Sequence, residues 1–323
     1  MYKGYITDIE GIKVGHAQNF DGGTGLTVLI PPKGNTASVD VRGGGPGTRE
    51  TDLLNPVNTV SEVSAIVLSG GSSYGLAGSV GVVEELEKDG RGFEVPSGIV
   101  PIVPQAILYD LDYKSYKIRP DKKMGSDAYK NASFTENRQG IIGAGTGATV
   151  GKALGKEFLM KSGLGSATIS VGDLKVSALV AVNAMGDIFD DEENKQIAGI
   201  LKNNKFIPTL EVLEKISEKN SLNTTIGIVA TNGKFSKTEL RKIASMTHNG
   251  YARAIRPVHT MMDGDTIFSL ATNKIKADIN LVGSLGAKVM ARAIANAIYF
   301  SNIENSSEFI WENNWLLKLI IVT

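Results

Sequence analysis

Strand and helix patterns alternate over the C-terminal third of the chain, and this alternation constrains the fold more than any other sequence feature. Residues 225–230 form an apolar β segment, and residues 266–271 form another. Between them, Ser236 and Glu239 make a capping box that opens an amphipathic helix. Residues 279–300 carry a second long helix with one apolar stripe. Each element must bury its apolar face against another, so the pattern predicts a layered α+β fold.

The rest of the chain is typical of short strands interrupted by glycine and proline. The predicted strands cover residues 25–31, 37–42, 65–69, 99–109, 167–171 and 174–182, the last two forming a hairpin. The predicted helices cover residues 76–88 and 124–132. Residues 140–151 are too glycine-rich for a helix and predict a close-packed loop. Residues 191–222 are polar and predict a mobile linker, with local helix as the alternative.

The composition argues against several classes of function. Lys+Arg and Asp+Glu both number 34, so the chain lacks the basic surplus that phosphate binding needs, and nucleic acid is not expected as a partner. It contains no cysteine, which excludes disulfides, thiol catalysis and thiolate metal sites. We see neither a secretory signal nor an apolar stretch of about 20 residues, so we expect a cytoplasmic protein without a membrane span.

The segment GGSSYG is the first candidate site. Its residues 71–75 match G-x-S-x-G between a predicted strand and a predicted helix, which is the context of a nucleophile elbow with Ser73 as the nucleophile. A serine hydrolase would also need an acid and a histidine further along the chain, and only His248 and His259 are available. A structural glycine loop is the alternative interpretation.

The segment GAGTGATVGK resembles a phosphate-binding loop but fails its pattern. The motif needs glycine at position 146 and serine or threonine at position 153, which are Thr146 and Ala153 here. Lys152 is still of interest, because a lysine beside a glycine-rich loop can approach a substrate without steric hindrance.

The segment Met262-Asp263-Gly264-Asp265 is a third candidate. Two acids that flank a glycine could bind a hard cation, although a calcium loop would need an acid where Lys274 stands. The alternatives are a solvated turn, or acids that orient a catalytic group.

The fourth candidate is the bond between Asn223 and Thr224, where the polar segment ends and a β segment begins. Attack of the Thr224 hydroxyl on the Asn223 carbonyl would convert the peptide to an ester, and hydrolysis would free the α-amine of Thr224. Such an amine has a pKa near ~7.7–8.0 and can act as general base for the hydroxyl of its own residue. This chemistry needs neither cysteine nor histidine.

Five segments together resemble a known family, the L-aminopeptidase/D-esterase (DmpA-type) family of self-processing hydrolases. They are ITDIEGIKVGH, ASVDVRGGGPGTRE, SGGSSYGLAG, NTTIGIVATN and RPVHTMMDGDTIFSLAT, and they span the chain from about residue 8 to about residue 300. Within the family, the chain looks close to the 6-aminohexanoate-oligomer (nylon-oligomer) hydrolases. The resemblance implies a four-layer αββα sandwich, of the kind shared with ornithine acetyltransferases.

The resemblance also implies how the chain is processed and which residues act. Residues 1–323 would be one hydrolase domain, cut into an α chain (1–223) and a β chain (224–323), with Thr224 as nucleophile. Asp263 and Asp265 match the acid pair that orients the new amine and hydroxyl. Tyr74 and Asn183 match positions that bind the oxyanion or the substrate amide, and Lys152 matches a lysine near the nucleophile.

We therefore predict metal-free and cofactor-free hydrolysis of an amide through an acyl-Thr224 intermediate, in a homo-oligomer. The substrate would be a small peptide, an amino-acid amide or an ω-amino-acid oligomer. One alternative is an ornithine/glutamate N-acetyltransferase, whose Met-Ala-Thr motif is absent here. The others are a serine hydrolase using Ser73 and an inert binding homologue. Other family branches use a serine nucleophile with a Ser/Glu pair, so this chain departs from them at Thr224 and at its two aspartates.

Overall fold

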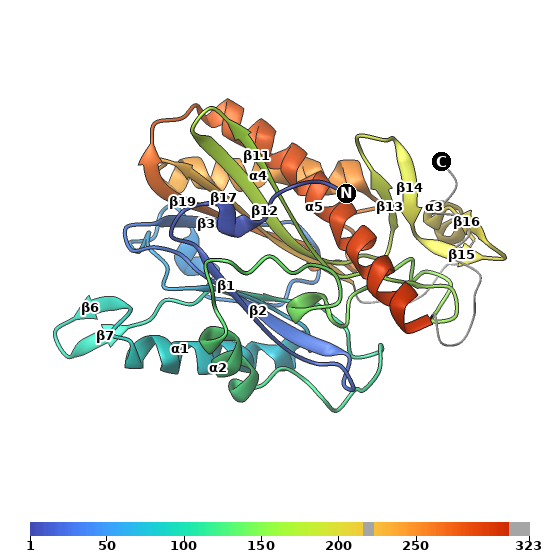
Figure 1. Ribbon diagram of the computed structural model, residues 1–323, viewed down its shortest axis with the longest axis horizontal. Coiled ribbons are helices and arrows are strands. Elements are labelled where there is room, and N and C mark those ends of the chain that lie inside the picture. Colours follow the sequence, from blue (N-terminus) through green and yellow to red (C-terminus); the bar gives the residue numbers. More distant parts are fainter. Residues whose placement is uncertain (216–222, 310–323) are drawn as a thin grey trace.

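Two five-stranded β-sheets form the centre of the structure, with helices on their outer faces. The computed structural model describes residues 1–215 and 223–309. Figure 1 shows α4 and α5 along one side of the stacked sheets and α1 and α2 along the other. This is the four-layer αββα arrangement predicted from the family resemblance.

The first sheet has the order β1-β2-β5-β8-β4. Its strands are Lys13–Asn19, Thr24–Ile30, Ile66–Ser69, Gln105–Ile107 and Thr48–Arg49. Every residue of β2 is buried, as expected for a strand covered on both faces. Helices α1 (Gly78–Lys88) and α2 (Lys122–Lys130) cover the outer face, and their apolar side chains pack against Leu26 and Val28 of β2.

The second sheet has the order β11-β12-β17-β19-β3 and contains the longest strands. They are Leu164–Val171, Leu174–Asn183, Thr224–Gly233, Thr266–Ile275 and Thr36–Val41. Strands β17 and β19 pair in parallel, whereas the other neighbours in this sheet are antiparallel. The parallel pair needs a crossover, and α4 (Lys237–Ala254) supplies it.

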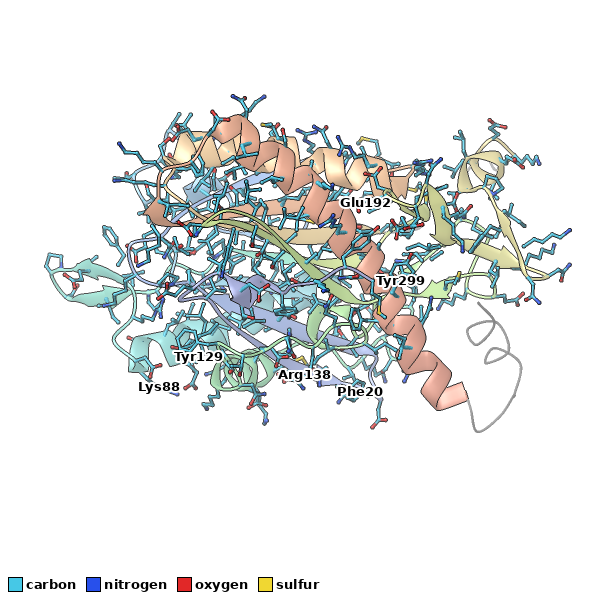
Figure 2. The ribbon with its side chains drawn as sticks, turned by 45° about the horizontal axis from the view of Figure 1, so that its top comes forward. Phe20, Lys88, Tyr129, Arg138, Glu192 and Tyr299 are labelled. Carbon is cyan, nitrogen blue, oxygen red and sulfur yellow. The ribbon has the colours of Figure 1, made fainter. Side chains whose placement is uncertain are left out.

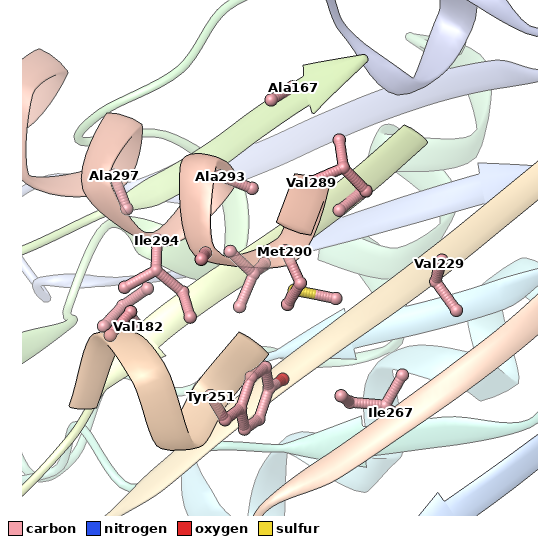
Figure 3. Close-up of a cluster of buried hydrophobic side chains, with 14 of the residues drawn as sticks. Ala167, Val182, Val229, Tyr251, Ile267, Val289, Met290, Ala293, Ile294 and Ala297 are labelled. Carbon is pink, nitrogen blue, oxygen red and sulfur yellow. The ribbon is translucent and has the colours of Figure 1, made fainter. Parts of the chain in front are cut away.

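Helix α4 and the long helix α5 (Ile279–Phe309) cover the outer face of the second sheet. The predicted capping box is present, since the Ser236 hydroxyl accepts from the Glu239 N–H and the Glu239 carboxylate accepts from the Ser236 N–H. Figure 3 shows how α5 side chains such as Met290 and Ile294 fill the space above the strands beside Tyr251 of α4. A separate apolar core lies between the two sheets and includes Leu68 and Phe268.

Small elements complete the chain. They are the 3-10 helices η1 to η4 (Ile6–Asp8, Asp52–Leu54, Ser72–Ala77 and Gly143–Gly145), the short helix α3 (Thr209–Leu213), and the strands β6, β7, β9, β10, β13, β14, β15, β16 and β18 (Phe93–Val95, Gly98–Val100, Thr149–Val150, Met160–Lys161, Asp187–Asp190, Lys195–Ala198, Ile200–Lys202, Lys205–Ile207 and Ile255–Arg256).

The structure corrects two expectations about the secondary structure. Residues 191–213 are not a linker, because β14, β15, β16 and α3 lie within them. Asn203 and Asn204 both have positive φ, which is the turn chemistry of a tight hairpin. Of the predicted buried strand 99–109, the first two residues belong to the largely exposed hairpin β6–β7. Residues 101–108 are buried, but only Gln105–Ile107 forms a strand. Residues 216–222 of the predicted linker lie outside the described residues, as does the apolar C-terminal segment LLKLIIVT, for which we expect a final strand or a packed extension.

Helix α5 is apolar enough to resemble a membrane helix, contrary to our expectation that no stretch would qualify. The segment Ile279–Ile303 passes by length and composition, but 72% of its most apolar window is buried inside the protein. Polar side chains on α5 also connect it to the protein: Tyr299 donates to Asp190, and Arg292 pairs with Glu192. Figure 2 shows Tyr299 on this helix and Glu192 beside it. These features are those of a core helix.

Gly165 of β11 allows α5 to approach the sheet closely. A Cβ atom at this position would lie 2.0 Å from the Ala293 carbonyl oxygen and 2.4 Å from the Ala297 nitrogen. Both are backbone atoms of α5 and cannot move aside separately from the helix.

We therefore expect Gly165→Ala to destabilise the fold by at least ~2 kcal/mol, because the helix must shift from the sheet. Thermal unfolding should show a Tm lowered by roughly 5 °C or more. Ser170→Ala, at an exposed position of the same strand, serves as the control and should change Tm by no more than about 1 °C. Equal Tm values for the two variants would contradict this account.

Candidate active site

Three strand ends meet where the Asn223–Thr224 bond lies. Strands β17 and β19 run in parallel, so their N-terminal ends, which begin at Thr224 and Thr266, lie at the same edge of the sheet. Strand β12 runs the other way, so its last residue, Asn183, lies opposite Thr224. Both acids of the segment Asp263–Asp265 precede β19 and therefore reach the same edge. The topology thus brings together residues that are up to 82 positions apart, from 183 to 265.

The peptide bond between Asn223 and Thr224 is buried and held in place. Only 1% of Asn223 and 4% of Thr224 is exposed. The Thr224 hydroxyl donates to the carbonyl oxygen of Asn223. The Gly264 N–H donates to the same oxygen at 3.0 Å, and the Asn223 N–H donates to the Met262 carbonyl at 3.0 Å. A side-chain hydroxyl and a backbone N–H therefore converge on one carbonyl oxygen.

The carboxylate of Asp265 is fixed through both of its oxygens. Oδ1 accepts from the Thr225 N–H at 2.8 Å. Oδ2 accepts from the backbone N–H of His259 at 3.1 Å and from its ring Nδ1 at 2.9 Å. Asp265 thus connects Thr225 to His259, which the sequence analysis considered only as part of a serine site.

The carboxylate of Asp263 lies close to that of Asp265 and is oriented by Thr260. Its Oδ2 accepts from the Thr260 N–H at 2.8 Å and from the Thr260 hydroxyl at 2.6 Å. Burial, together with the neighbouring Asp265 carboxylate, raises the pKa of Asp263 to about 6. The group can therefore exchange a proton close to neutral pH.

The glycines of the segment RGGG hold the acid-bearing turn. The Arg42 N–H donates to the Asp265 carbonyl at 2.9 Å, and the Gly44 N–H donates to the Thr260 carbonyl at 3.1 Å. A Cβ atom on Gly43 would lie 2.2 Å from the Asp263 carbonyl oxygen. Backbone contact this close explains why a glycine stands there.

Lys152 and Asn183 form the other side of the site. The Lys152 ammonium donates to the Asn183 side-chain oxygen at 2.6 Å and to its backbone oxygen at 3.2 Å. The Asn183 side-chain NH₂ donates to the Tyr109 carbonyl at 2.8 Å. Burial lowers the pKa of Lys152 to about 7, although Asp110 and Asp263 oppose this shift. Near neutral pH, the lysine is therefore divided between its charged and neutral forms.

Asp110 is a buried acid that the sequence analysis missed. It accepts from the Gly71 N–H and from the Thr24 hydroxyl, both at 2.7 Å. Burial raises its pKa to about 6. Asp110 thus connects the GGSSYG segment to the neighbourhood of Lys152, a link that no local sequence pattern reveals.

Tyr74 stands apart from this cluster. It is 49% exposed, its hydroxyl lies 3.4 Å from that of Tyr116, and the Arg119 guanidinium lies 3.8 Å from the centre of its ring. These contacts do not connect Tyr74 to Thr224, whereas the other predicted site residues are linked to Thr224 by their contacts. The predicted role of Tyr74 in binding the oxyanion or the substrate amide stays a prediction.

The geometry of the described residues supports neither a serine nucleophile at Ser73 nor a metal site. Ser73 is exposed, whereas both candidate histidines are committed elsewhere, His248 to the Asp40 carbonyl and His259 to Asp265. The GGSSYG segment itself forms η3, which leads into α1. Among the described residues, no group of three or more histidine and acidic side chains is arranged to hold a metal ion.

Comparisons with known proteins agree with the resemblance stated from the sequence. Residues 4–306 match the model of peptidase family S58. An uncharacterized aminopeptidase of Mycobacterium tuberculosis is 37% identical, over 90% of this chain and 92% of its own length. A 6-aminohexanoate-oligomer endohydrolase of a Kocuria species is 32% identical, over 94% of this chain and 83% of its own length.

A solved structure shares the fold. It is the L-aminopeptidase D-Ala-esterase/amidase of Ochrobactrum anthropi, described as a new variant of the Ntn hydrolase fold. The TM-score is 0.68 at 16% identity, with 92% of this chain and 86% of that chain covered. At this level of identity the likeness concerns the fold, and it confirms the predicted class.

The lowered pKa of Lys152 makes a prediction about stability. The unfolded chain holds the lysine proton up to a pKa near 10.5, whereas the folded chain loses it near 7. The free-energy cost of burying the charged lysine is therefore present in full below pH 7 and disappears as the pH rises towards 10.5. The substitution Lys152→Met removes this cost. Asn183 Oδ1 is still hydrogen-bonded in the variant, because the Thr149 N–H also donates to it.

We expect Lys152→Met to raise Tm at pH 6.5 by roughly 2 °C or more, the gain shrinking towards pH 10, while amide hydrolysis falls. Differential scanning calorimetry across this pH range measures the effect. Lys156→Met, which replaces an exposed lysine paired with Asp112, is the control and should show no pH-dependent gain. A Tm gain that is independent of pH would refute the assignment.

Proposed function

Since the chain belongs to peptidase family S58 and is a hydrolase of amide bonds, we propose that it cuts its own backbone between Asn223 and Thr224 and then uses Thr224 as the N-terminal nucleophile. The single observation that carries this proposal is the geometry of the Asn223 carbonyl. The hydroxyl of Thr224 contacts its oxygen, and the Gly264 N–H donates to that oxygen.

Self-cleavage would take two steps, rearrangement of the peptide bond to an ester and hydrolysis of that ester. The Thr224 oxygen attacks the carbonyl carbon of Asn223 and forms a C–O bond, while its proton passes to a neighbouring base. The C–N bond then breaks, the nitrogen takes up a proton, and an ester with a free Thr224 amine results. Water hydrolyses the ester and leaves a carboxylate on Asn223. The negative charge on the carbonyl oxygen is stabilised by the Gly264 N–H, and such a donor contributes about 10²–10³-fold in rate.

Turnover repeats the chemistry on a substrate. The α-amine of Thr224, with a pKa of about 7.7–8.0 in an ordinary environment, accepts the hydroxyl proton while the oxygen attacks the substrate amide. The amide nitrogen leaves protonated, and water then releases the acyl group from Thr224. Lys152 and Asp263, which have pKa values of about 7 and about 6, can exchange protons in the same pH range.

The names of the relatives support a substrate class. One is called an aminopeptidase and another a 6-aminohexanoate-oligomer endohydrolase. We propose that this enzyme acts on small peptides, amino-acid amides or ω-amino-acid oligomers, needs no metal or organic cofactor, and works in the cytoplasm as a homo-oligomer of cleaved αβ units. Acetyl transfer of the ornithine type has no observation in its favour here.

Removing only the hydroxyl of Thr224 tests the proposal. Thr224→Val keeps the β-branched shape that suits the strand but should leave one uncut chain of about 34.3 kDa without hydrolase activity. Thr224→Ser keeps a hydroxyl and should still cut. Intact-mass spectrometry reads both results. Wild-type protein that is active with an unbroken backbone at this bond would overturn the mechanism.

Crowding the nucleophile gives an independent test. A Cβ atom on Gly264 would lie 2.8 Å from the Thr224 Oγ1, so Gly264→Ala should displace the hydroxyl and slow self-cleavage by about 100-fold. At Gly45 the nearest atom would be 3.7 Å from the new Cβ, so Gly45→Ala is the matched control and should cut at nearly the wild-type rate. The disappearance of the full-length band over time measures both rates, and equal half-lives would count against the geometry.

A further inference from the structure

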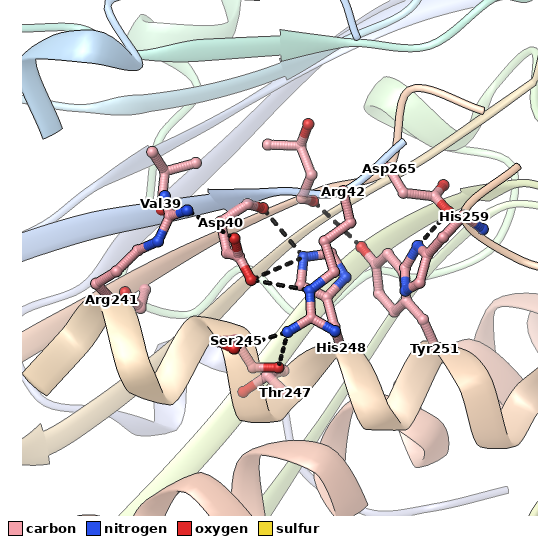
Figure 4. Close-up of polar contacts among 12 residues, drawn as sticks. Val39, Asp40, Arg42, Arg241, Ser245, Thr247, His248, Tyr251, His259 and Asp265 are labelled. Carbon is pink, nitrogen blue, oxygen red and sulfur yellow. Dashed lines mark hydrogen bonds and ion pairs between the residues drawn. The ribbon is translucent and has the colours of Figure 1, made fainter. Parts of the chain in front are cut away.

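His259 has a contact with Asp265 that the mechanism above does not use. Its ring Nδ1 and its backbone N–H both donate to Asp265 Oδ2, at 2.9 Å and 3.1 Å. The other oxygen of this carboxylate accepts from the Thr225 N–H at 2.8 Å. One side chain thus bridges His259 and the peptide unit that follows the nucleophile, and Figure 4 shows the contact between His259 and Asp265.

The surroundings hold the His259 ring in a single place. It stacks on Tyr251 with ring centres 6.0 Å apart and meets His248 edge-on at 4.8 Å. The Tyr251 hydroxyl donates to the Thr266 carbonyl at 3.3 Å, and His248 Nε2 donates to the Asp40 carbonyl at 3.0 Å. Figure 4 shows these rings side by side between α4 and the strands. Because a carboxylate accepts, the His259 Nδ1 carries the hydrogen.

The backbone at His259 is also unusual. Its φ of 59° lies in the left-handed region, which only a few per cent of non-glycine residues adopt. Such strain persists when the surrounding structure enforces it and is concentrated at functional sites. Here the conformation lets the N–H and the ring nitrogen of one residue reach the same carboxylate oxygen.

Cleavage changes what holds Thr224. Before the cut, Asn223 restrains Thr224 from its N-terminal side; afterwards Thr224 is a chain end, and chain ends tend to fray. On the β12 side, Thr224 still pairs with Asn183. On the β19 side, regular pairing begins only at Ile226 and Thr266, so Asp265 supplies the hydrogen bond at Thr225.

We propose that His259 is a positioning residue of the mature enzyme: by fixing the Asp265 carboxylate, it holds the Thr224–Thr225 peptide in place once Thr224 has become a chain end. This inference rests on the proposed function. It requires His259 to matter for turnover more than for self-cleavage, since the uncut chain restrains Thr224 on both sides.

Two substitutions separate the hydrogen bond from the backbone conformation. Asparagine and glycine both tolerate positive φ, but only the amide of asparagine can replace the Nδ1 donor. We expect His259→Asn to keep kcat within about 3-fold of wild type. We expect His259→Gly to lower kcat by about 10- to 100-fold with KM within about 3-fold, the effect of one hydrogen bond to a charged group. Both variants should cut themselves within about 5-fold of the wild-type rate.

The remaining histidine, His16, controls for lost stability. It lies on β1 in the other sheet, where its ring is buried 2.9 Å from the Thr27 hydroxyl. His16→Ala should lower Tm and leave kcat of the cleaved enzyme within about 3-fold of wild type. Steady-state kinetics on cleaved protein, with Tm recorded for each variant, gives the comparison.

The inference is overturned if His259→Gly retains kcat, if His259→Asn is as slow as His259→Gly, or if self-cleavage falls as much as turnover does. Failure of the proposed function itself is a different result. It would appear as active wild-type protein that remains uncut, whatever the His259 variants do.

Discussion

The parallel pairing of β17 with β19 is the constraint on which the rest of the site depends. It aligns the starts of two strands, so the peptide before Thr224 and the turn before Thr266 lie at the same edge. The isolated parallel bridge between Asn223 and Asp263 lies three residues before the first pair of the ladder, in the same register. The Gly264 N–H and the Thr224 hydroxyl then both reach the Asn223 carbonyl oxygen, and the Asp265 carboxylate reaches the Thr225 N–H. The antiparallel neighbour β12 adds Asn183 from the opposite direction, and with it Lys152.

The site also requires backbone segments to approach one another closely, and glycine residues allow this. Gly43 lets the N-terminal segment lie against the acid-bearing turn, and Gly264 leaves room for the Thr224 hydroxyl. Ionisable groups buried in so tight a site are costly in their charged forms. Asp110, Asp263 and Lys152 all have pKa values shifted towards neutrality by that burial. The desolvation that makes these groups useful for proton exchange therefore also opposes folding.

Much of the fold could be predicted because its signals are local. The capping box at Ser236 and the hairpin around Gly172 were predicted from adjacent residues, and both are present. The interpretation of residues 191–213 as linker was wrong, because Asn203 and Asn204, both at positive φ, make a tight turn between two short strands. Five of the six candidate catalytic residues come together with Asn223, whereas the contacts of Tyr74 are with Tyr116 and Arg119. The catalytic roles of all six stay predictions.

The sequence by itself determined which chemistry was open to this protein. The absence of cysteine excludes a thiol nucleophile and leaves the hydroxyls of Ser73 and Thr224 as candidates, and the family resemblance favours Thr224 with its own α-amine as base. Only the tertiary structure decided which groups surround that threonine. No local sequence pattern predicts the contacts of His259, Thr260, Asp110 and the Gly264 N–H, because the positions of these groups depend on strand direction and register. Pairing between strands distant in sequence sets these, and no local pattern encodes them.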